Sequence, residues 1–197
     1  DTAIGTITDN DSAAVTVDSV SAAEGGGLLF TVTLNNAVAG AFSVNVTLTD
    51  VSATGGAAPL VTPEDYNNVV AALNFAGTGG EFQQFTVVTL DDALLESTET
   101  FSVSLNATDP LVTDTDTGTG TITDNDSAQV TVNSVAAAEG SGLLFTVTLD
   151  NAVASPFSVN VTLSDVSATG GAAPLVAPED YDDVVADVRD FLAARVA

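Results

Sequence analysis

The chain has 197 residues, of which 27 are acidic and only two are basic, giving a formal net charge of −25. Such a charge repels nucleic acids and anionic membrane surfaces, so we expect neither nucleic-acid binding nor membrane insertion. Histidine and cysteine are absent, which argues against a zinc or copper site and against a disulfide framework. The apolar content of 45%, arranged periodically, argues for a folded chain rather than a disordered one.

Apolar residues alternate with threonine and serine through the first two thirds of the chain, the pattern of half-buried β-strands. The expected strands cover residues 15–17, 30–34, 42–48, 69–75, 82–90 and 101–105, and a last strand ends at Ile122. Glycine-rich turns separate them. The sequence therefore predicts an all-β fold, a seven-stranded Greek-key, immunoglobulin-like β-sandwich that is repeated in tandem, with the second copy incomplete.

The tandem organisation comes from a long internal repeat. Residues 12–71 recur almost unchanged at 127–186, at an offset of 115 positions, which is the length of a sandwich domain rather than of a solenoid unit. We expect residues 1–11 to be the closing strand of a preceding repeat, 12–126 a complete domain and 127–197 a partial second domain. The tail 187–197 no longer matches, and its apolar spacing indicates a helix.

A second, shorter repeat marks where one domain ends and the next begins. The sequence Gly-Thr-Ile-Thr-Asp-Asn-Asp-Ser-Ala occurs at 5–13 and again at 120–128. Its first half reads as a strand, and its Asp-Asn-Asp segment favours a turn because these side chains bond to their own backbone. Each copy therefore closes one β unit and opens the next.

In an alternating up-and-down course, the first, third, fifth and seventh predicted strands end on the same side of the sandwich. Their following loops bring together eight carboxylates, which define what we call the acidic end: Glu24, Asp50, Asp91, Asp92, Glu96, Glu99, Asp124 and Asp126. So many carboxylates must either take up protons or bind cations. Calcium accepts six to eight oxygen ligands in flexible geometry, whereas magnesium prefers fewer protein ligands, so we predict Ca²⁺ as the cofactor.

Two other interpretations of the acidic residues are open. An acidic surface of a salt-adapted protein would also carry many carboxylates, although it would have no reason to avoid the loops after residues 34 and 75. A general acid/base pair formed by Asp91-Asp92 and Glu96 would imply an enzyme, but no nucleophile or histidine accompanies them. We therefore do not expect an enzyme.

At this point the residues resemble the Calx-β domain family. The matching pieces are Val-Thr-Val before Ala-Ala-Glu24-Gly, then Leu-Phe-Thr-Val-Thr-Leu, then Asp65-Tyr66, then Asp91-Asp92-x-x-x-Glu96-x-x-Glu99-x-Phe101, and the closing Gly-Thr-Ile-Thr-Asp-Asn-Asp. The family occurs in sodium–calcium exchangers and, in tandem, in bacterial surface proteins.

The resemblance implies a sandwich with calcium at one end. By motif position it implies carboxylate ligands at Glu24, Asp50, Asp92, Glu96, Glu99, Asp124 and Asp126. Leu94 would offer a backbone carbonyl, and Asn125 stands where the family often has aspartate. In the second repeat only Glu139 and Asp165 of this set remain.

These observations predict a calcium-binding structural or adhesive module of an extracellular or cell-surface bacterial protein, in which calcium stiffens the link between domains. Its expected partners are calcium ions and either neighbouring Calx-β repeats or copies of itself. The alternative is a subunit of an extracellular fibre whose copies join head to tail by sharing a strand.

Overall fold

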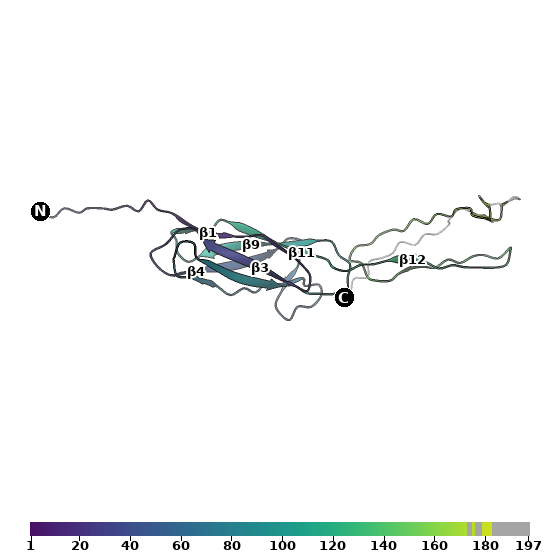
Figure 1. Cartoon of the computed structure of the whole chain (residues 1–197), viewed down its shortest axis with the longest axis horizontal. Helices are drawn as coiled ribbons and strands as arrows, with labels where there is room; N and C mark the ends of the chain where they lie inside the picture. Colours follow the sequence, from purple (N-terminus) through teal and green to yellow (C-terminus); the bar gives the residue numbers. More distant parts are fainter. Residues whose placement is uncertain (173–174, 176–178, 183–197) are drawn as a thin grey trace. The chain divides into compact units, whose positions relative to one another are not determined.

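The computed structural model describes residues 1–172, 175 and 179–182 (Figure 1). These residues form two compact units. The first contains residues 1–93 and 97–126, and the second contains residues 94–96 together with the described residues from 127 onward. In this part of the chain all regular structure is β, and no helix has the length and apolarity needed to cross a membrane. The expected helix in the tail 187–197 lies outside the described residues.

The first unit is a sandwich of two sheets. One sheet has the strand order β10-β1-β3-β8 and the other has the order β2-β11-β9-β4-β7. The strands, part of which Figure 1 labels, are β1 (Ala13–Val17), β2 (Val20–Ala23), β3 (Gly27–Leu34), β4 (Phe42–Asp50), β7 (Leu73–Phe75), β8 (Phe82–Val88), β9 (Glu99–Ala107), β10 (Val112–Thr113) and β11 (Thr117–Thr123). The prediction of an all-β sandwich is confirmed.

The core forms because alternate residues of the strands face inward. In β3, Leu28, Phe30, Val32 and Leu34 are fully buried, while the threonines between them are half-buried. Phe101 of β9 lies at the centre, with its ring stacked on Tyr66 at a centroid distance of 4.1 Å and edge-on to Phe30 at 6.1 Å. Burial of these apolar side chains is the main source of stability for the sandwich.

The first expected strand, at residues 15–17, is observed as β1, and a further strand that was not predicted, β2, follows it in the other sheet. β1 pairs with β3 in one sheet, and β2 pairs in parallel with β11 in the other. The crossing occurs at Asp18 and Ser19: Thr31 N donates to Asp18 Oδ1 at 2.7 Å, and Thr119 N donates to Ser19 Oγ at 3.0 Å. These two side chains hold the crossing segment to both sheets, so the alternation of Val15 and Val17 does not continue as one strand.

Other strands also differ from their expected lengths. The strand expected at 69–75 is observed only as β7, three residues that pair with β4. Between them the chain forms a short parallel pair, β5 (Gly55–Gly56) with β6 (Tyr66–Asn67). Tyr66 is fully buried, and its hydroxyl donates to Asp50 Oδ1 at 2.6 Å. This bond closes the long loop after β4 onto the core.

The second unit repeats several local features of the first. β12 (Val130–Val132) pairs with β13 (Val147–Leu149) as β1 pairs with β3, and β14 (Gly170–Gly171) pairs with β15 (Tyr181–Asp182) as β5 pairs with β6. Tyr181 donates to Asp165 Oδ1 at 2.6 Å, as Tyr66 does to Asp50. The described residues of this loop therefore make the same strand pairing and the same tyrosine–aspartate bond in both copies.

Candidate metal site

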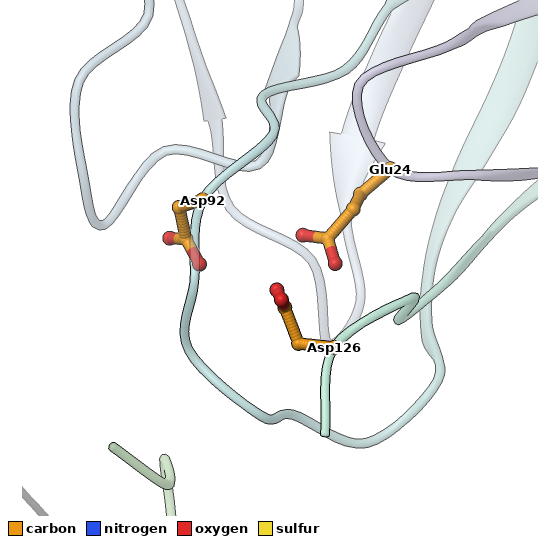
Figure 2. A group of neighbouring side chains, drawn as sticks. All are labelled: Glu24, Asp92 and Asp126. Atoms are coloured by element: carbon orange, nitrogen blue, oxygen red, sulfur yellow. The ribbon is translucent and has the colours of Figure 1, made fainter. Parts of the chain in front are cut away.

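Three carboxylates from three separate loops of the first unit point toward one another. Glu24 follows β2, Asp92 lies in the segment after β8, and Asp126 follows β11 (Figure 2). One oxygen of each carboxylate lies within 4.8 Å of those of the other two, and all three side chains are half-buried. No lysine or arginine occurs among the described residues. Protein cations from this part of the chain therefore do not neutralise the cluster.

The strand pairing explains why these loops meet. β2 and β11 are parallel with Ala23 opposite Thr123, and the Glu24 N–H donates to the Thr123 carbonyl at 3.1 Å. The Gly25 N–H donates to the Leu90 carbonyl at 3.0 Å, which brings the end of β8 against the β2–β3 turn. The ends of β2, β8 and β11 therefore lie together.

Gly25 is needed at this contact. Its φ is +69°, and a Cβ at this position would lie 2.7 Å from the Cβ of Asp91. A side chain here would both strain the backbone and push Asp91 away, so only glycine allows the turn and the aspartate to come this close.

Asn125 joins the three loops by hydrogen bonds. Its backbone N–H donates to Glu24 Oε1 at 3.1 Å, and its side-chain amide is 3.3 Å from both the Glu24 carbonyl and Asp91 Oδ1. The side-chain amide of Asn125 therefore positions Glu24 and Asp91. A carboxylate in its place could not donate these two hydrogen bonds.

Asp126 has an oxygen that the protein does not satisfy. Its backbone N–H donates to Asp124 Oδ1 at 2.6 Å, which closes the turn after β11. Among the described residues, Asp126 Oδ2 is buried and has no hydrogen-bond partner. A buried, unsatisfied carboxylate oxygen is costly. A hard cation, whose preferred ligands are carboxylate and carbonyl oxygens, fits this donor set.

The proximity of the carboxylates changes their proton affinity. The pKa of Glu24 is raised from 4.5 to about 7, mainly by burial. A hydrogen bond to Asp124 and the negative charges of Asp124 and Asp126 contribute to this rise, while the hydrogen bond from the Asn125 N–H opposes it. Burial and the charges of Asp124, Asp92 and Asp91 also raise the pKa of Asp126. The metal-free site therefore favours protonated carboxyl groups.

This proximity predicts a pH dependence for the metal-free protein. Because the folded state holds the Glu24 proton up to about pH 7 and the unfolded state loses it near pH 4.5, the folded state binds more protons in this window. Stability is then greatest below the window and falls as pH rises through it. We expect the melting temperature in chelator to decrease between pH 5 and pH 7.5, and Glu24→Gln to reduce that slope. A melting temperature that rises over this range would contradict the prediction.

The other predicted ligands of the acidic end are placed in different ways. Asp91 is exposed, and Asp124 is half-buried beside Glu24 and Asp126. Asp50 Oδ1 accepts hydrogen bonds from the Gly55 N–H at 2.9 Å and from the Tyr66 hydroxyl. Leu94 and Glu96 are half-buried and belong to the second unit.

The structure also places near the predicted ligand Glu99 a carboxylate that was not among the predicted ligands, that of Asp65. Asp65 and Glu99 each offer an oxygen, and the two oxygens lie within 4.8 Å of each other. Asp65 Oδ2 also accepts a bond from the Thr54 N–H at 2.6 Å. The signal in the sequence was the Asp65-Tyr66 pair: Tyr66 is buried in the core, and this fixes the residue before it at the acidic end.

In the second unit the two remaining predicted ligands lie apart from any such cluster of described residues. Glu139 is exposed. Asp165 Oδ1 accepts bonds from the Tyr181 hydroxyl and from the Gly170 N–H at 2.8 Å, and these bonds lower the pKa of Asp165.

Comparisons with protein families and with solved structures find the same kind of domain. The model of the Calx-beta domain matches residues 8–127. Among solved structures, the apo form of the Calx CBD1 domain is similar at 19% identity, over 59% of this chain and all of that one, with a TM-score of 0.47. The calcium binding domain CBD12 of CALX1.1 is similar at 20% identity, over 57% of this chain and 44% of that one, with a TM-score of 0.44. The Calx CBD2 domain is similar at 15% identity, over 60% and 91%, with a TM-score of 0.44. A comparison with curated proteins finds no match.

Proposed function

The chain belongs to the Calx-beta family of calcium-binding domains, and we propose that its first repeat binds Ca²⁺ through Glu24, Asp92 and Asp126, with Asp91 and Asp124 beside them. The single observation that carries this proposal is the convergence of three half-buried carboxylates on one point, one of them with a buried oxygen that has no hydrogen-bond partner among the described residues. Calcium would supply the positive charge that this part of the protein lacks.

The proposed role is structural rather than catalytic. A cation held by Glu24, Asp92 and Asp126 would cross-link three loops that are also joined by hydrogen bonds such as those of Asn125. Asp126 directly precedes the second repeat in the sequence, so binding also restricts the residues that link the repeats. We place this module in an extracellular or cell-surface bacterial protein, where it stiffens or presents neighbouring repeats. The tandem repeat, which resembles that of bacterial surface proteins, supports this assignment.

Calcium titration by isothermal calorimetry tests the site. Asp92→Asn keeps the size of the side chain and removes its charge. An interaction with a charged group contributes about 1.5–3 kcal/mol, and each 1.4 kcal/mol is about tenfold in affinity, so we expect affinity to fall by about 10- to 100-fold. The matched control is Asp109→Asn. Asp109 is also half-buried but lies in the loop between β9 and β10, and its Oδ1 accepts a local bond from the Leu111 N–H.

The control separates a specific site from a general effect of negative charge. Loss of affinity in Asp92→Asn alone supports the proposal. Equal losses in both variants, or heat of binding too small to measure in the unmodified chain, would refute it.

A further inference from the structure

Residues 5–11 are a copy of a strand and turn that closes the first repeat. In the first unit, the same sequence at 120–126 forms the end of β11 and the turn after it, where Ile122 is only 6% exposed. In the copy at 5–11, Ile7 stands in the place of Ile122 and is 99% exposed. Figure 1 shows this N-terminal segment as an extended trace outside the sandwich. A strand sequence that is buried at one position is therefore fully exposed at the other.

The second repeat exposes apolar side chains whose counterparts in the first repeat are buried. Phe145 is 45% exposed, whereas Phe30 at the same place in the first repeat is fully buried. Val132 is 62% exposed and its counterpart Val17 only 7%. Residues 135–138 correspond to β2, the strand that pairs with β11, but they belong to no strand. The second repeat thus presents both an apolar face and an unpaired strand sequence.

We propose that residues 5–11 of one copy of the chain add as a strand to the second repeat of another copy. The offset of 115 positions sets the register, because β11 pairs in parallel with β2 from Gly120 opposite Val20 to Thr123 opposite Ala23. The added strand therefore pairs Gly5 with Val135 and places Ile7 against the apolar face. Strand addition of this kind gains its affinity from main-chain hydrogen bonds and its selectivity from alternate side chains.

The added segment also carries the turn that follows β11. The Asp11 N–H donates to Asp9 Oδ1 at 3.0 Å, as the Asp126 N–H donates to Asp124 Oδ1. In the first repeat, Glu24 contacts this turn through the Thr123 carbonyl and the Asn125 N–H. Glu139 is the corresponding residue of the second repeat, and Thr8 and Asn10 are the corresponding partners. The turn is therefore already formed before the pairing.

A second copy is the occupant that the residues specify. The position for this strand in the chain's own first repeat is held by β11 itself, which pairs with both β2 and β9. A contact between the start of one copy and the second repeat of the next joins two different surfaces, so it propagates from copy to copy instead of closing as a symmetric dimer. This is the fibre-subunit alternative that the sequence left open. The pairing itself does not depend on the proposed calcium site.

The test uses the full chain, with excess calcium to neutralise the carboxylates, and measures mass by light scattering over a range of concentrations. Ile7→Asp places a charge on the inward side of the added strand. The matched control is Ile4→Asp: Ile4 is 94% exposed, but it corresponds to Thr119, which is exposed in β11. We expect the unmodified chain and Ile4→Asp to grow past the dimer mass with concentration, and Ile7→Asp to lose this association.

A synthetic peptide of residues 1–12 provides the second measurement. We expect it to inhibit association of the unmodified chain, and the same peptide with Ile7→Asp not to do so. A chain that stays monomeric at every concentration, as it would if residues 5–11 paired within their own copy or not at all, overturns the proposal. Equal loss of association in the Ile4→Asp and Ile7→Asp variants also overturns it.

Discussion

Replacing Phe101 with alanine is expected to cost the first repeat about 3–5 kcal/mol of unfolding free energy, the usual range for a fully buried phenylalanine. Phe101 is 0% exposed and contacts the rings of Tyr66 and Phe30. A Cβ on Gly120 would clash with its ring, so the backbone of β11 packs directly against it. Because domains of this size are stable by only about 5–15 kcal/mol, the variant is expected to be marginally folded.

Chemical denaturation of the full chain measures this effect, and hydrogen exchange at the amides of β9 assigns the transition to the first repeat. The matched control is Phe82→Ala. Phe82 has the same side chain but is 57% exposed at the start of β8, and a surface substitution of this kind usually changes stability by less than about 0.5 kcal/mol. Similar losses in the two variants would mean that Phe101 is not the centre of the core.

The parts of the fold that the sequence predicted are those in which one periodic pattern decides the structure. Apolar and polar residues alternate along β4, β9 and the part of β3 from Phe30 onward, and this alternation predicts the strands that carry Phe30 and Phe101. Alternation does not tell a strand which sheet it joins. The division of β1 from β2 depends on two side-chain bonds, from Thr31 to Asp18 and from Thr119 to Ser19, that link residues far apart in the sequence.

The candidate site, like the fold, could be predicted from the sequence only in part. The direction of each strand predicts which loops meet, and the structure brings Glu24, Asp92 and Asp126 together from three of them. The direction of a strand does not predict where a carboxylate points. Asp50 ends β4 at this end of the sandwich, yet its Oδ1 accepts from the buried Tyr66 hydroxyl. Asp65 lies near Glu99 because Tyr66 is anchored in the core, which is a tertiary contact that no short motif encodes.

Calcium is expected to stabilise the first repeat by roughly 2.7 kcal/mol at about a hundred times its dissociation constant, because it binds the folded state and not the unfolded one. For a domain of this size each kcal/mol shifts the melting temperature by about 4–8 °C, so we expect a rise of roughly 10 °C or more. Magnesium should give a much smaller rise, since it prefers to keep its water ligands. Scanning calorimetry with calcium, magnesium and chelator measures the three states.

Asp126→Asn is expected to change the metal-free and calcium-loaded states in opposite directions. Without metal, burial and the charges of Asp124, Asp92 and Asp91 disfavour the ionised Asp126 carboxylate, so removing its charge should raise the melting temperature in chelator. With calcium, the same substitution removes a ligand charge and should lower the melting temperature toward the metal-free value. Asp109→Asn, in the loop between β9 and β10, should change neither state. A substitution that only weakened the packing would lower both melting temperatures, and that result would contradict the assignment of Asp126 to a cation site.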